Sequence, residues 1–337
     1  MSGIINTLLA GMHIGFNGGK NLFLIKTRNI KNFSTLFFLF SFLFLGNSGL
    51  FSQKIVEITF LQDAKNAYVF SAYNHAFCNY TLEIQFPMFI NVKADKTLPL
   101  RVEVKPGMNK LFSLTAINPN EAVKFNYSSN SYKGCMQVTT DTAFPYLLPI
   151  GTGKEAQVYE MSNQNGGQNN WYGIRIKMKP GDTIYAARRG VVTEVLEGDT
   201  SNDAGVASAG HENYIEIVHA DCTFGHYGIL KRNGSLVRPG QLVKAGEPIG
   251  LVGGDPYGRG SEIRFSVYYN QVAENSMTPY MVYVPYQCWT KNNGKGRLKH
   301  GALYSSEFPL SIVNREEAKK PRKGEIKPVK KKKTRTK

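Results

Sequence analysis

The chain is poor in the residues from which several common kinds of site are built. Only four cysteines and six histidines occur among 337 residues, and no two cysteines have the spacing Cys-x-x-Cys. This argues against a structural zinc site of the paired-cysteine type. No apolar run reaches the roughly 20 residues that a comfortable membrane span needs. Long amphipathic helical patterns are also missing, so short strands must supply most of the fold.

Acidic residues are absent from the first 53 positions and scarce at the other end. The whole chain has 41 basic and 25 acidic residues and a net charge of +16. Residues 1–53 contribute +4 and residues 315–337 contribute +9, which leaves only +3 for residues 54–314. Binding of nucleic acid needs lysines and arginines gathered on a folded surface or arm. The nearly neutral centre therefore predicts no nucleic-acid partner.

The N-terminal 53 residues have the pattern of an export signal. Basic residues between Lys26 and Lys31 precede a 13-residue apolar run at 33–45, and small residues follow it. We expect residues 1–53 to be a signal peptide or, alternatively, an uncleaved N-terminal anchor. In either case the remaining chain is predicted to be exported to the periplasm, the cell envelope or the exterior.

Residues 54–140 alternate apolar and polar residues in several short segments. The clearest are 56–60, 67–70, 80–84, 100–104 and 122–125, with turn-forming clusters between them. Strands at this spacing predict a β-sandwich domain. Residues 145–304 are also strand-rich, but glycines recur at the turns, as at Gly181, Gly190, Gly240 and Gly250. The predicted fold class is therefore all-β throughout.

The cysteines lie two on each side of residue 145. In an exported protein the simplest arrangement is one disulfide per domain, Cys78–Cys135 and Cys222–Cys288. Four cysteines allow three pairings, and the sequence does not choose among them. An arrangement in which all four cysteines are buried free thiols is the remaining alternative.

Three segments of the second domain correspond to motifs of one known family. Residues 182–192 read DTIYAARRGVV and correspond to the first motif. Residues 219–250 match, without gaps, a longer pattern that runs from His-x-Asp-Gly-Thr to Ile-Gly, and residues 260–267 correspond to the third motif. In order and spacing, residues 145–304 resemble the lysostaphin-type (LytM) peptidoglycan endopeptidases. The resemblance implies a β-barrel or sandwich of the duplicated hybrid motif type and, in an ordinary member, a zinc cofactor.

The resemblance also implies where the chemistry would lie. Family members hold zinc with the His and Asp of an H-x-x-x-D motif and the last His of H-x-H, and two further histidines act on water and the oxyanion. A zinc ion with three protein ligands and one open position activates its bound water. This sequence differs at all five positions, which carry Trp171, Arg175, Ile229, Glu262 and Arg264. The resemblance therefore implies a pseudoenzyme with no catalytic residue at these positions and no zinc.

Three other histidines of the domain are the candidates for a relocated metal site. His219 matches a family position with no catalytic role, His226 lies three residues before the changed Tyr-x-His-Leu histidine, and His211 lies in a Gly/Ala/Ser-rich loop. An odd offset along a strand places His226 on the face opposite to that position unless a bulge turns it.

Glu262 and Arg264 share one strand face, and the resemblance places Arg175 near them. Two interpretations stay open. The three side chains are either a closed ionic network or a cationic site for an anionic group such as a peptide carboxylate. The tail at 315–337 is predicted to be disordered, with loose adhesion to anionic envelope polymers or a membrane surface as its possible role.

These observations lead to one principal hypothesis and two alternatives. The principal one is an exported envelope protein whose degenerate LytM-like domain binds peptidoglycan or regulates a cell-wall hydrolase, as some degenerate members of the family do. The first alternative is an active zinc endopeptidase with relocated ligands. The second is a structural scaffold or adhesion module.

Overall fold

The computed structural model describes residues 54–162, 171–198, 212–255, 260–272 and 278–314. The predicted signal segment, the basic tail and His211 lie outside these residues. The described chain is built of strands and contains one short helix, α3 (Leu310–Val313), which confirms the all-β prediction. In the described part, no helix has the length and apolar character needed to cross a membrane.

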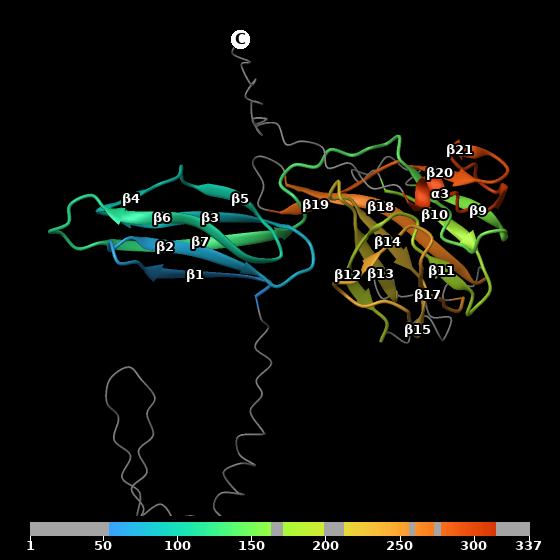
Figure 1. The fold of residues 1–337 in the computed structure, drawn as a ribbon, viewed down its shortest axis with the longest axis horizontal. Coiled ribbons are helices and arrows are strands. Elements are labelled where there is room, and N and C mark those ends of the chain that lie inside the picture. Colours follow the sequence, from blue (N-terminus) through green and yellow to red (C-terminus); the bar gives the residue numbers. More distant parts are fainter. Residues whose placement is uncertain (1–53, 163–170, 199–211, 256–259, 273–277, 315–337) are drawn as a thin grey trace, which may run out of the picture. The chain divides into compact units, whose positions relative to one another are not determined.

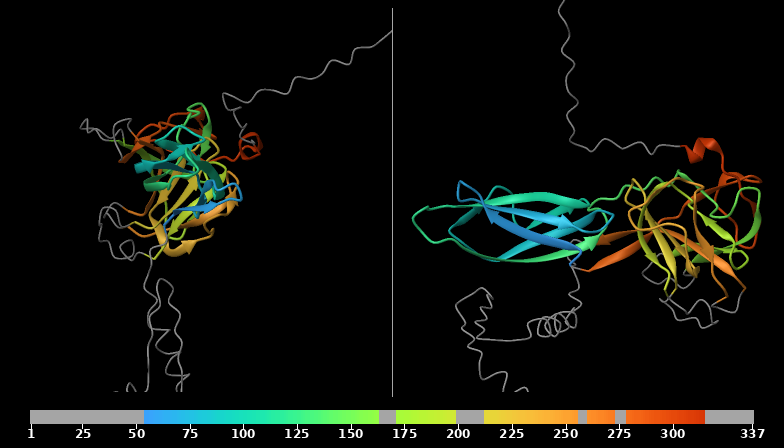
Figure 2. Two further views of the ribbon diagram at one scale, coloured as in Figure 1. Left: turned by 90° about the vertical axis from the view of Figure 1, so that its left-hand side faces the viewer. Right: turned by 60° about the horizontal axis from the view of Figure 1, so that its bottom comes forward.

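The N-terminal strands form two antiparallel sheets (Figure 1 and Figure 2). The first has the order β1-β2-β6-β4, with β1 (Val56–Gln62), β2 (Tyr68–Asn74), β6 (Gly107–Ala116) and β4 (Val92–Ala94). The second has the order β5-β3-β7, with β5 (Leu100–Val104), β3 (Tyr80–Ile90) and β7 (Lys124–Lys133). Inward side chains of both sheets, among them Phe70, Leu82 and Leu114, share one buried core because alternate residues of each strand point the same way.

The second part of the chain contains a nine-stranded sheet. Its path is β16 (Leu242–Val243), β12 (Gly190–Leu196), β13 (Tyr214–Val218), β14 (Phe224–Gly228), β18 (Glu262–Val272), β10 (Tyr172–Lys177), β9 (Glu155–Ser162) and β22 (Leu303–Ser305), and β19 (Pro279–Tyr283) pairs with β18. Two three-stranded sheets accompany it. They are β11 (Thr183–Tyr185), β17 (Pro248–Val252) and β15 (Leu230–Ser235), and β21 (Gly294–Gly296), β20 (Gln287–Thr290) and β8 (Pro145–Leu147).

The large sheet has one apolar face and one polar face. Along β18 the side chains of Ile263, Phe265 and Val267 enter the core, together with Ile174 and Ile176 of β10. Alternation then places the residues between them on the opposite face, which we call the outer face. The chain also contributes to buried packing after β22, since Ile312 of α3 packs with Leu147 and Ala245 in a small apolar cluster.

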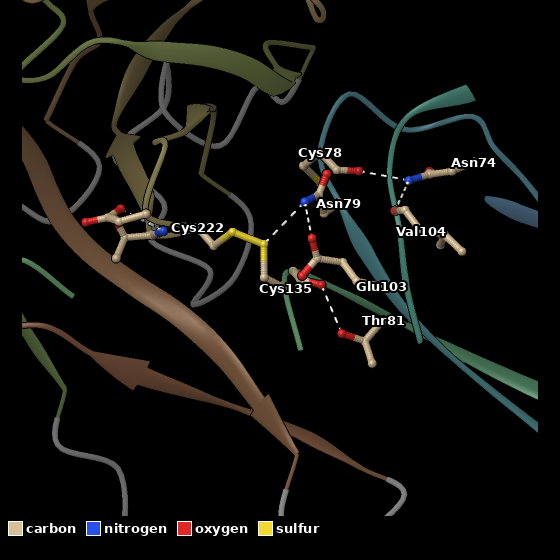
Figure 3. The surroundings of a disulfide bond; sticks show 11 residues. Asn74, Cys78, Asn79, Thr81, Glu103, Val104, Cys135 and Cys222 are labelled. Atoms are coloured by element: carbon tan, nitrogen blue, oxygen red, sulfur yellow. Dashed lines mark hydrogen bonds between the residues drawn. A yellow bond between two sulfur atoms is a disulfide. The ribbon is translucent and has the colours of Figure 1, made fainter. Parts of the chain in front are cut away.

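The predicted disulfide pairing is wrong. The bond joins Cys135, just after β7, to Cys222 in the turn before β14 (Figure 3). Cys78 and Cys288 are buried free thiols. Cys78 belongs to the N-terminal core and Cys288 to the core of the second part, so each of these two thiols is taken up by apolar packing. Burial raises the pKa of the Cys78 thiol to about 12.

The disulfide is one of several contacts between the two parts of the chain. Phe224 and Tyr268, from β14 and β18, belong to the N-terminal core. The amide of Asn270 donates to the Lys133 carbonyl at 3.0 Å. The ring of Phe77 lies over Gly240, where a Cβ atom would stand 2.7 Å from the ring. Apolar, polar and covalent contacts thus all contribute to this junction.

Candidate functional site

The antiparallel pairing of β10 with β18 sets two arginines side by side. Arg175 is the register partner of Arg264, and Lys177 is the partner of Glu262. Like charges in directly opposed positions of a sheet repel each other. These strands therefore need an anion close by, and the register supplies Glu262 on the same outer face.

Glu262 lies at the centre of the cations and is almost fully buried, with 1% of its side chain exposed. Nη1 of Arg175 donates to its Oε2 at 3.2 Å, and Nε of Arg264 donates to its Oε1 at 3.5 Å. Nζ of Lys177 lies 3.8 Å from the same carboxylate. We call Arg175, Lys177, Glu262 and Arg264 the arginine cluster. Its three cations surround one carboxylate, which removes much of their mutual repulsion.

Further side chains extend the arginine cluster on both sides. Nη1 of Arg264 lies 3.7 Å from Oε2 of Glu212, whose Oε1 lies 3.5 Å from Nε2 of His226. On the other side the Arg175 guanidinium lies over the Tyr159 ring, 5.0 Å from its centroid. The sequence interpretation missed Lys177, Glu212 and Tyr159. Only Lys177 has a sequence signal, because it lies two residues after Arg175 on the same strand face.

The structure brings together three of the five residues that the resemblance places at the family's functional positions. Arg175, Glu262 and Arg264 are in direct contact, as described above. Trp171 lies just before β10, where its half-buried ring contacts Tyr283 with the centroids 6.4 Å apart. Ile229 is fully buried between β14 and β15, with a φ of 68° that a β-branched residue rarely adopts.

The histidines that were candidates for a relocated metal site are not gathered in the described residues. His226 lies half-buried on β14, and its ring is tilted by 35° against the Tyr214 ring, with the centroids 4.8 Å apart. His226 contacts Glu212, which also approaches Arg264, so it belongs to the surroundings of the arginine cluster. His219 is buried elsewhere, beside the Tyr146 ring and the Arg189 carbonyl.

The residues that the resemblance places at the family's zinc positions do not fit a zinc ion. Zinc ligands are thiolate, imidazole and carboxylate groups, whereas two of these positions hold guanidinium groups, which stay protonated. Both carboxylate oxygens of Glu262 face cations. Across the described ranges, no group of three or more His, Cys, Asp or Glu side chains is arranged to hold a metal ion.

His219 has a structural environment. Its Nδ1 lies 2.9 Å from the Arg189 carbonyl, and a carbonyl can only accept, so Nδ1 carries the proton. Its Nε2 is buried and has no hydrogen-bond partner among the described residues. Burial, together with the nearby Arg188 guanidinium, holds the pKa of His219 well below its ordinary value. Arg188 itself is buried and paired with Asp221 at 2.9 Å.

The lowered pKa of His219 predicts a pH-dependent stability. The folded chain keeps this ring neutral, whereas the unfolded chain takes up a proton as the pH falls below about 6.5. The free energy of unfolding should therefore decrease on acidification. In His219→Asn, which keeps a donor toward Arg189, urea denaturation at pH 7 and pH 5 should show a smaller decrease, by up to about 1.4 kcal/mol per pH unit. Equal decreases in both proteins would contradict this assignment.

Comparison with known proteins identifies the second part of the chain. The family model of peptidase family M23 matches residues 169–276. No curated protein matches the chain.

Three solved structures illustrate the likeness. The catalytic domain of the antimicrobial peptidase lysostaphin from Staphylococcus simulans is 21% identical, and the match covers 36% of this chain and 85% of that one with a TM-score of 0.27. A variant catalytic domain of the prophage-encoded M23 protein EnpA from Enterococcus faecalis is 21% identical, with coverages of 40% and 92% and a TM-score of 0.29. A zinc-containing peptidase from Vibrio cholerae is 13% identical, with coverages of 63% and 82% and a TM-score of 0.28.

The family match spans the strands that carry Arg175, Glu262 and Arg264, and it agrees with the LytM-type resemblance of the sequence motifs. The chain therefore contains, at residues 169–276, a domain of peptidase family M23.

Proposed function

We propose that this chain is an exported envelope protein whose M23 domain binds peptidoglycan through the peptide carboxylates and does not cleave it. The observation that carries the proposal is the arginine cluster, in which Arg175 and Arg264 stand at positions where the family resemblance implies zinc ligands. Both guanidinium groups contact the buried Glu262. Replacing two ligands by fixed cations removes the means of holding a metal and leaves donors suited to anions.

The charge balance of the cluster supports an anionic ligand. Arg175, Lys177 and Arg264 carry three positive charges, while Glu262 and Glu212 carry two negative ones. Both arginines are partly exposed, at 16% and 20% of the side chain, so that water or a ligand can reach them. An arginine binds a carboxylate through two parallel hydrogen bonds, which supplies both strength and direction.

Metal content and cleavage test the non-catalytic part of this proposal. The full chain, purified without chelators, should contain no stoichiometric zinc by elemental mass spectrometry. Incubation with isolated sacculi should release no muropeptides, with lysostaphin as the positive control on a susceptible cell wall. Stoichiometric zinc together with muropeptide release would overturn the proposal and establish an active endopeptidase with relocated ligands.

Co-sedimentation with sacculi tests the binding part. Arg264→Gln should bind about tenfold or more weakly, because a charge-assisted bond to a carboxylate is lost. Arg232→Gln, an exposed position on β15 in another sheet, is the matched control and should bind like the unaltered protein. Equal binding by both variants would refute a role of the cluster, and a complete lack of binding would leave the scaffold alternative.

A further inference from the structure

A cavity of about 410 Å³ lies where the two parts of the chain meet. One wall comes from the N-terminal sheet β5-β3-β7 and includes Arg101 and Tyr132. The opposite wall is the end of β18, from Tyr269 to Val272. The segment 136–139 and Cys135 complete the lining. The volume is within the range of cavities that bind small ligands.

The lining is rich in hydrogen-bonding groups and has no carboxylate among its residues. Gln137, Thr139, Asn270 and Gln271 supply amide and hydroxyl groups, and Met136, Val138 and Val272 supply apolar surface. The lining has two cations, Arg101 and Lys133. The Lys133 ammonium is engaged by Glu216 and Glu194, so Arg101 is the cation that remains for a ligand.

Arg101 has donors to spare. Its described ion pair is with Glu83, 3.5 Å from Nη2, and Glu83 also accepts a hydrogen bond from Tyr132 at 3.1 Å. A guanidinium group has five N–H donors, and about a third of this side chain is exposed. An arginine edge in a cavity that is also lined by amide residues suits a free carboxylate that is attached to a peptide bond.

We propose that this cavity is a second ligand site, which binds a short peptide through its free C-terminal carboxylate. Arg101 binds the carboxylate, and the amide and hydroxyl groups of the lining bind the peptide groups. The Cys135–Cys222 disulfide fastens the segment beside Cys135 to the M23 domain, so the walls are held in place before a ligand arrives. A preformed site costs less ordering on binding. The site is separate from the arginine cluster and does not depend on its function.

Calorimetric titration of the full chain with N-acetyl-alanyl-alanine tests the site. The free acid should bind saturably, and the corresponding C-terminal amide about tenfold more weakly, because it cannot form the charge-assisted pair. Arg101→Gln should bind the acid no better than the amide. Gln271→Glu, at an exposed position, should weaken binding of the acid and leave binding of the amide unchanged.

Two further variants locate the probe. Arg264→Gln, in the arginine cluster, and Arg232→Gln, on β15, should both bind the acid like the unaltered protein. The proposal is overturned if acid and amide bind equally, if neither binds saturably, or if Arg264→Gln loses the acid while Arg101→Gln retains it. Thermal melting of each variant shows whether it is folded. If Arg101→Gln does not fold, Gln271→Glu still decides the test.

Discussion

Lys133→Met should lower the free energy of unfolding by about 3–5 kcal/mol, because it leaves a buried carboxylate without its cation. Lys133, at the end of β7, forms an ion pair with Glu216 of β13 and lies 3.0 Å from Glu194. Only 3% of the Glu216 side chain is exposed. Its remaining partners within the described ranges are the hydroxyls of Tyr268 and Thr193, neither of which carries a charge.

The protonation state of Lys133 agrees with its role as the cation that neutralises Glu216. Burial by itself would lower the pKa of the ammonium group, but the carboxylates of Glu216 and Glu194 more than offset this and raise its pKa above the ordinary value. Lys133 therefore keeps its charge over the whole neutral range. The pair joins the N-terminal sheet to the M23 domain, so its loss should affect the junction as well as the local packing.

Urea denaturation of matched variants measures the effect. Lys110→Met, at an exposed site on β6, controls for the change in side chain and should cost under about 1 kcal/mol. The double variant Lys133→Met/Glu216→Gln should recover part of the loss, because no unpaired charge is then buried. A cost for Lys133→Met no larger than that for Lys110→Met would show that Glu216 finds water or another partner.

Removal of the disulfide is the second large effect. The double variant Cys135→Ser/Cys222→Ser should be less stable by about 2–4 kcal/mol, because the bond closes a loop between residues 87 positions apart and restricts the unfolded chain. For a folded body of this size the melting temperature should fall by roughly 5–15 °C. The unaltered protein, once reduced, should have the same melting temperature as the double variant.

Thiol labelling checks the pairing independently of stability. In unfolded but unreduced protein, an alkylating reagent should modify Cys78 and Cys288 only, because these are the free cysteines. Cys78→Ala should keep the bridge and show the same drop in melting temperature on reduction. Labelling of Cys135 or Cys222 before reduction would contradict the assigned bond.

The all-β class follows from the sequence because strand alternation is a local signal. Segments such as 80–84 and 100–104 became β3 and β5, with Leu82, Ile84 and Val104 buried as their pattern requires. The strand β6, at 107–116, was not expected. It begins on the glycine of a Lys-Pro-Gly turn, and its outer positions alternate less clearly. Turn chemistry marks where a strand ends better than where the next begins.

The site was predicted in part. The resemblance correctly associated Arg175 with Glu262 and Arg264, since spacing within matched motifs fixes strand register. It gave no means of finding Glu212 or Tyr159, which come from other strands and loops. The disulfide was missed for the same reason, since pairing depends on how two domains meet. The Lys133–Glu216 pair likewise joins residues whose proximity only the tertiary structure creates.

The bridge between Cys135 and Cys222 also makes the burial of Cys78 important during maturation. As the chain is made from its N-terminus, Cys78 and Cys135 are both present before Cys222, and at that stage they are the first thiols able to react with each other. The N-terminal core encloses Cys78, so packing of that core withdraws this thiol from exchange. Because this core also includes Phe224 and Tyr268, which follow Cys222 in the chain, it is completed only with the later strands, and burial of Cys78 then prevents a wrong cross-link.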